Sequence, residues 1–221
     1  MSYYLKQQNL FLFIILLLSA CSSPQPQNKW QYDAAGMCKN YQEHFLQDKP
    51  LRANLDLRHA RELASRTADL KTLIDIELTV CAMELSTLNP GQCDKVSHLL
   101  TLEPNTEQNA YHRLLISQFS QEDLPDLPSQ YKHFAQALLH NDKTKINEAL
   151  SKIEPLSSQL VASALAEEEI DDKNIDEIIQ KLSFNGYKRV LLAWLVVQMQ
   201  REDNPEEKAR LKAKIEVLTS N

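Results

Sequence analysis

The sequence contains little glycine: three glycines stand among 221 residues, and none belongs to a glycine-rich loop. Glycine lets the backbone adopt left-handed conformations and approach a ligand closely, so phosphate cradles, dinucleotide-binding fingerprints and tight β-hairpins depend on it. The sequence therefore argues against all three. Leu, Ala, Glu, Gln and Lys are abundant instead, and all of them favour helices. The composition predicts an all-α protein.

Catalytic and metal-binding motifs are missing as well. The chain has no G-x-S-x-G elbow, no C-x-x-C and no H-E-x-x-H. His59 and Glu62 lie one turn apart on an expected helix, and His133 and His140 share a face of another, but no third ligand accompanies either pair. We therefore predict no catalytic residue, no cofactor and no metal site, in a protein that is not an enzyme.

The densest acidic run, "EEEIDDKNIDE" from Glu167 to Glu177, fails as a calcium-binding loop. An EF-hand that begins at Asp172 requires glycine at its sixth position and glutamate at its twelfth, where the sequence has Glu177 and Ser183. The run is better interpreted as the end of one helix and the start of the next. Asp171 and Asp172 would then lie near the positive end of the helix dipole.

Basic tracts are also absent. The 24 Lys and Arg residues are outnumbered by 30 Asp and Glu residues, so the formal net charge is −6. An acidic chain without a Lys- or Arg-rich segment argues against nucleic acid as a partner and against charge-driven binding to anionic membranes.

One apolar run stands out, Leu10 to Leu18 in "LFLFIILLLSACSS". A bilayer-spanning helix needs about 20 apolar residues, so this run is too short to span. It has the length of the apolar centre of a signal peptide, and Lys6 lies in the short region before it. The run ends in Leu18-Ser19-Ala20-Cys21, which resembles the bacterial lipobox.

The lipobox resemblance implies that the signal is cut before Cys21, that its thiol receives a diacylglycerol, and that the new amino terminus is acylated, for example with palmitate. Several acyl chains hold a protein on a membrane without a spanning helix, because each buried CH₂ contributes about 0.8 kcal/mol. In lipoproteins of this class, Asp after the cysteine favours the inner membrane. Ser22 stands there in this sequence, which implies the outer membrane and its periplasmic face.

Three regions are expected along the chain. Residues 1–20 form the cleaved signal peptide, residues 21–29 carry the lipid and a flexible tether, and residues 30–221 form an all-helical domain. The tether segment "SSPQPQNK" has two prolines and no apolar residue, which is typical of an extended linker.

Proline positions and amphipathic segments divide the domain into short helices. We expect them at 32–47, 52–67, 69–86, 90–102, 106–120, 128–141, 143–153, 156–168, 173–183, 186–202 and 205–219. Asn89-Pro90 and Asn204-Pro205 each place a capping side chain before a proline at the first helical position. Short connections predict antiparallel helix pairs.

Three segments share a tyrosine followed by basic residues and an apolar face: "YHRLLISQF" at Tyr111, "YKHFAQALL" at Tyr131 and "YKRVLLAWL" at Tyr187. Repeated helix pairs favour an α-solenoid. The arrangement loosely resembles tetratricopeptide-like repeats, although the spacing is not that family's usual one of about 34 residues and its Trp-Leu-Gly-Tyr signature is absent. An irregular helical bundle is the alternative.

The region from Lys29 to Cys93 begins "KWQYDAAGMCKNYQEHF" and contains "CAMELSTLNPGQC". It resembles uncharacterised lipoproteins of the Campylobacterota. This resemblance covers less than half of the mature chain and implies no particular activity.

The run "VLLAWLVV", from Val190 to Val197, is apolar on every face and predicts a central, buried helix. The alternative is an exposed groove that receives a partner helix, with Trp194 as its anchor. In that alternative Trp194 and Tyr187 are the candidate partner-binding residues.

Three cysteines remain once Cys21 carries the lipid. Cys38, Cys81 and Cys93 would then lie in an oxidising compartment. If a short turn joins two antiparallel helices between them, Cys81 and Cys93 lie at nearly the same level, which predicts a disulfide. The alternatives are a bond from Cys38 to either one, or three free thiols.

These features together predict an outer-membrane lipoprotein whose helical domain binds or scaffolds an unidentified envelope protein. The alternatives are an envelope enzyme or accessory factor in cell-wall remodelling, and an immunity protein against a periplasmic toxin.

Overall fold

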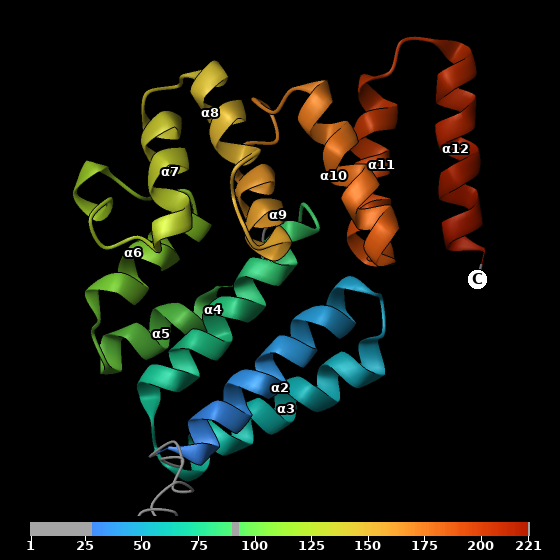
Figure 1. The fold of residues 1–221 in the computed structure, drawn as a ribbon. Helices are drawn as coiled ribbons and strands as arrows, with labels where there is room; N and C mark the ends of the chain where they lie inside the picture. Colours follow the sequence, from blue (N-terminus) through green and yellow to red (C-terminus); the bar gives the residue numbers. More distant parts are fainter. Residues whose placement is uncertain (1–27, 90–92, 221) are drawn as a thin grey trace, which may run out of the picture.

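The computed structural model describes residues 28–89 and 93–220, and within these ranges it contains eleven α-helices and no strand (Figure 1). The predicted all-α class is confirmed, and each helix overlaps one of the expected ranges. The helices are α2 (Lys29–Leu46), α3 (Pro50–Arg66), α4 (Leu70–Ser86), α5 (Asp94–Leu102), α6 (Thr106–Leu115), α7 (Lys132–Leu139), α8 (Lys143–Leu150), α9 (Leu156–Leu165), α10 (Asp172–Asn185), α11 (Lys188–Arg201) and α12 (Pro205–Thr219). Two 3₁₀-helices, η1 (Gln121–Asp123) and η2 (Ser129–Tyr131), lie between α6 and α7.

Several helices begin at a residue whose side chain accepts a hydrogen bond from a backbone N–H of the first turn. These capping residues are Asp69, Asn105, Asp142, Asp171 and Asn204. The caps satisfy N–H groups that have no partner within the helix. The predicted Asn204-Pro205 start of α12 is confirmed, and so is the opening of α10 by Asp171 and Asp172.

The start of α5 differs from the prediction. The helix begins at Asp94, four residues later than expected, and Cys93 occupies the capping position before it. An Asn-Pro pair suits a turn as well as a helix start, whereas the carboxylate of Asp94 is favoured in the first turn by the helix dipole. Cys93 therefore lies just before the helix and not one turn inside it.

Helix α4 lies at the centre of the fold, where it contacts α2, α3, α5, α6 and α9 (Figure 1). A helix surrounded in this way needs apolar or paired side chains on most of its faces. The buried residues of α4 are Ile74, Ile76, Glu77, Leu78, Cys81, Ala82, Met83 and Ser86.

The other helices form packed pairs: α2 with α3, α7 with α8, and α10 with α11, with α12 against the outer side of α11 (Figure 1). Helix pairs occur in solenoids and in bundles alike. Here α2 also contacts α11, and α4 contacts α9. These contacts join elements far apart in the sequence, whereas solenoid units contact mainly their neighbours. The chain therefore combines helix pairs with the long-range closure of a bundle.

Helix α11 confirms the buried interpretation of "VLLAWLVV". Trp194 is 0 % exposed, and Val190, Leu195 and Val197 are buried around it. Because the indole is fully covered, Trp194 belongs to the core and not to a surface groove. No helix among residues 28–89 and 93–220 combines the length and hydropathy that a bilayer crossing requires.

Candidate functional site

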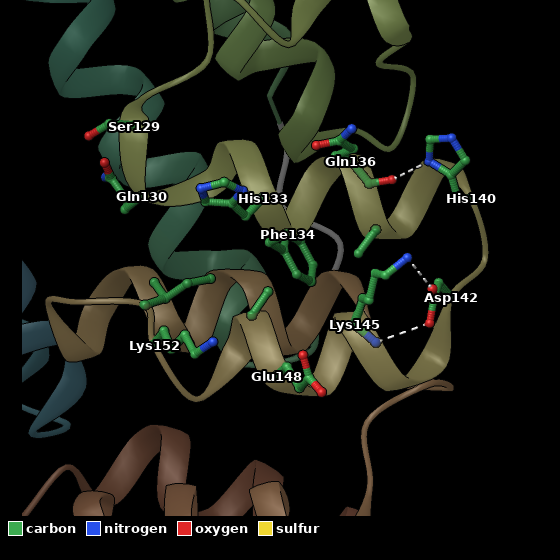
Figure 2. A pocket seen from close by; sticks show the side chains of 13 residues that line it. Ser129, Gln130, His133, Phe134, Gln136, His140, Asp142, Lys145, Glu148 and Lys152 are labelled. Atoms are coloured by element: carbon green, nitrogen blue, oxygen red, sulfur yellow. Dashed lines mark hydrogen bonds and ion pairs between the residues drawn. The ribbon is translucent and has the colours of Figure 1, made fainter.

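A hollow of about 720 Å³ lies between α7 and α8 (Figure 2). We call it the α7–α8 groove, and it is lined by side chains from Ser129 to His140 and from Asp142 to Ile153. The volume lies within the range of about 300–1,000 Å³ that is usual for ligand pockets. The groove is therefore large enough to receive several side chains of a partner.

The floor of the groove is apolar. Phe134 is fully buried between the two helices, and Ala137 and Ile153 are almost completely covered. Ala149 lines the same floor and is half-buried. Ala137 in α7 and Ala149 in α8 place small side chains in the lining of the groove. An apolar side chain from a partner would lose its contact with water here, which is the main favourable term in association.

One end of the groove is polar and already paired. Asp142 caps α8 by accepting from the Lys145 N–H at 3.1 Å, and its carboxylate also pairs with Lys145 Nζ at 3.0 Å. His140 Nδ1 lies 2.7 Å from the backbone oxygen of Gln136, at the same end (Figure 2). These interactions hold the end of the α7–α8 connection in place.

Three ionisable side chains of the groove have no partner among the described residues. They are the imidazole of His133, the carboxylate of Glu148 and the ammonium of Lys152, all of which are exposed. His133 belongs to α7 and Glu148 to α8, and Lys152 follows the end of α8 (Figure 2). An apolar floor bordered by unpaired donors and acceptors is the usual composition of a protein–protein interface.

Residues outside the groove hold both of its walls in place through ring stacking and hydrogen bonds. The ring of Tyr131, which precedes α7, stacks on Tyr111 with a centroid distance of 5.4 Å, and burial raises the pKa of both phenols. In α8, the Asn147 side-chain oxygen accepts hydrogen bonds from the Asp171 N–H at 2.8 Å and from Asn174 Nδ2 at 3.0 Å. A surface fixed in this way loses little conformational entropy when it binds.

A second hollow of about 420 Å³ lies where α2, α3, α4, α5 and the start of α11 meet. We call it the junction cavity. Its walls include the ion pair of Arg61 and Glu77, in which Arg61 Nε and Nη2 donate to the two carboxylate oxygens at 2.6 and 2.7 Å. Tyr41 and Arg189 also line it.

Tyr187 lies at the edge of this junction. Its hydroxyl donates a hydrogen bond to Glu43 in α2 at 2.7 Å. Partial burial and the hydrogen bond to Glu43 raise the pKa of Tyr187 to about 12. In this structure Tyr187 therefore fastens α11 to α2.

The predicted cysteine pair comes together. The Cα atoms of Cys81 and Cys93 are 5.3 Å apart, within the usual disulfide range of 4.4–6.8 Å.

Cys38 is half-buried and separate from that pair. Burial raises the pKa of its thiol, and a hydrogen bond with Thr79 opposes this. Cys21, the predicted lipidation site, lies outside the described residues.

Local sequence patterns contain a partial signal for the groove and none for the junction cavity. His133 in α7 and His140 at its C-terminal cap both line the groove, but the groove also includes Glu148 of α8 and Lys152 just after it. Among the residues that the structure describes, no group of three His, Cys, Asp or Glu side chains could hold a metal ion.

Three comparisons bear on these sites: with protein-family models, with curated proteins and with solved structures. None of the three finds a match to this chain.

Proposed function

We propose that this protein is a lipid-anchored binding module of the outer membrane, exposed to the periplasm, that holds another envelope protein and catalyses no reaction. The lipobox-like Leu18-Ser19-Ala20-Cys21 supports the anchor. The observation that carries the binding role is the α7–α8 groove, with its apolar floor, its unpaired polar rim and its braced walls.

Binding in this groove would combine two effects. An apolar side chain of the partner would pack against Ala149 on the groove floor, with a gain of about 25 cal/mol for each Å² of apolar surface removed from water. The unpaired side chains of His133, Glu148 and Lys152 would then fix the orientation of the partner, because their hydrogen bonds require matching groups opposite them.

We further propose that Cys81 and Cys93 form a disulfide in the periplasm. Their Cα separation of 5.3 Å supports the bond. It would join the C-terminal half of α4 to the residue just before α5.

Site-specific photocrosslinking in intact cells tests the groove. A photoreactive amino acid is placed at Gln136 or at Lys152, both exposed beside the groove, and as a control at Lys212, which is exposed on α12. We expect one defined adduct from both groove positions and none from position 212. Equal labelling at all three positions would contradict the proposal.

A blocking variant makes the test specific. Ala149→Arg places a long side chain on the groove floor and should abolish the adduct. Ala213→Arg makes the same change on the exposed face of α12 and should leave the adduct unchanged. An adduct that persists in Ala149→Arg would show that the partner does not sit in the groove.

A further inference from the structure

The junction cavity contains more hydrogen-bond donors than its own acceptors use. Arg61 commits Nε and Nη2 to Glu77 and leaves Nη1 without a partner among the described residues. Arg189 donates from Nη2 to Asp48 at 2.9 Å, but its Nε is buried and unpaired. Lys95 likewise has no partner for its ammonium within the described part of the chain.

An aromatic wall lies beside Arg189. The Arg189 guanidinium carbon lies 4.4 Å from the centroid of the Phe45 ring, and the Phe45 and Tyr41 rings are 5.7 Å apart. Burial, followed by the charge of Glu84, raises the pKa of Tyr41, while Arg61 and Arg189 both act to lower it. Arg61, Arg189 and Tyr41 all line the cavity.

The acceptors of the cavity are mostly occupied. Glu77 accepts from Arg61 with both oxygens, and Glu84 has an interaction of its own. Asp94 is the lining carboxylate that has no partner among the residues described. Among the described residues, Asp94 is thus the one unpaired acid of the cavity. The same lining contains two guanidinium groups, the Lys95 ammonium and the Tyr41 hydroxyl.

Unpaired buried donors are rare in folded proteins, because such groups are nearly always hydrogen-bonded. Arginine matches a carboxylate particularly well, since its planar fork can donate two parallel hydrogen bonds. The cavity also has an apolar wall, formed by Phe45, Leu57, Val80 and Val96. The ligand that complements both surfaces carries an anionic carboxylate on an aliphatic body.

We propose that the junction cavity binds a small carboxylate ligand, either a free aliphatic acid or the C-terminus of a short peptide, with the carboxylate between Arg61 and Arg189. Its volume of about 420 Å³ suits a small molecule, because such sites span roughly 300–1,000 Å³. The cavity is separate from the α7–α8 groove, so this inference does not depend on the proposed protein partner.

Calorimetry and NMR on the full mature chain in detergent test the inference. The probes are hexanoate, N-acetyl-Ala-Ala with a free C-terminus, and the amide of that dipeptide. We expect at least one of the two acids to bind, with amide shifts at residues 41, 61, 95 and 189. The amide probe should bind about tenfold more weakly or worse than the free dipeptide, because a hydrogen bond to a charged group is lost.

The two acid probes distinguish the source of the carboxylate. Tighter binding of hexanoate assigns the cavity to free acids, and tighter binding of the acetyl dipeptide assigns it to peptide termini. Equal affinity for the dipeptide and its amide, together with no binding of hexanoate, would overturn the proposal, and so would failure of both acids to bind.

Three variants give a pattern that a purely structural role does not produce. Lys95→Gln and Tyr41→Phe each remove a donor that has no partner among the described residues, and both should weaken binding several-fold. Asp94→Asn removes the opposing acid and should strengthen it. Lys212→Gln, on the exposed face of α12, is the control and should change nothing. If Asp94→Asn weakens binding of the acids, the charge argument is wrong.

Discussion

Arg189 in α11 donates a hydrogen bond to Asp48 at 2.9 Å, although 141 residues separate them in the sequence. The same guanidinium lies over the ring of Phe45, and Tyr187 two residues earlier donates to Glu43. These contacts fasten the C-terminal helices to the α2–α3 pair, and they close the chain on itself.

The first prediction concerns this closure. Arg189→Ala removes an ion pair that is partly exposed and a cation–π contact, so we expect a loss of about 1 kcal/mol in the free energy of unfolding. Urea denaturation followed by circular dichroism measures it. Arg210→Ala, which breaks an exposed ion pair with Glu207 on α12, is the matched control and should change stability little. Equal effects of the two variants would contradict the importance of the closure.

The second prediction concerns the buried carboxylate of Glu77, which is 6 % exposed. Arg61→Ala leaves this charge without its partner, and breaking a buried ion pair from one side costs about 3 kcal/mol or more. The double variant Arg61→Leu with Glu77→Leu should recover much of that loss, because it buries no unpaired charge. Thermal unfolding compares the two, and a double variant less stable than Arg61→Ala would refute this explanation.

The third prediction is a pH dependence that comes from His112. Burial, and to a lesser extent the charge of Arg113, holds the pKa of His112 below its ordinary value of 6.5. The unfolded chain therefore binds this proton more readily than the folded protein does. The stabilising contribution of neutral His112 is complete above about pH 6.5 and is lost as the pH falls through the lowered pKa.

His112→Gln should flatten the decline of unfolding free energy below pH 6.5. Urea titrations at several pH values measure this slope. His98→Gln, at an exposed position of α5, should keep the wild-type slope. If His112→Gln and the wild type lose stability in parallel as the pH falls, His112 is not the group responsible.

The fourth prediction is the Cys81–Cys93 bond. Peptide mapping of unreduced protein from the envelope should recover the two cysteines in one crosslinked peptide. Replacing both by Ser should lower the unfolding free energy by about 2–3 kcal/mol, because a short closed loop no longer restricts the unfolded chain. A crosslinked peptide that contains Cys38, or complete alkylation of all three thiols without reductant, would contradict the pairing.

The sequence located the helices well because their signals are local. Apolar periodicity, together with caps such as Asn204 and Asp171, acts within a few residues, and these starts agree with the structure. The predicted helix boundaries are wrong where the chain can adopt another local backbone conformation. The helix expected to reach residue 120 ends at Leu115, shortly before Ser117 adopts a left-handed backbone with φ of 57°.

The α7–α8 groove and the junction cavity could not be predicted from local sequence signals in the same way. The junction cavity joins Tyr41, Arg61 and Arg189, and no local pattern states that helices so far apart in the chain will meet. The aromatic Trp194 illustrates the same limit, since an apolar helix suggests burial but does not reveal what covers it. Tertiary packing decides both, and only the structure contains it.

The central claim is that this domain works while tethered to a membrane through Cys21, and the intact mass of the protein purified from envelopes tests it most directly. We predict a chain that begins at Cys21 and carries the mass of a diacylglycerol and an amide-linked acyl chain, recovered in the outer-membrane fraction. Cys21→Ser should retain the signal and lose all lipid. An unmodified Cys21, or a Cys21→Ser protein of mature size that still fractionates with outer membranes, would contradict the account.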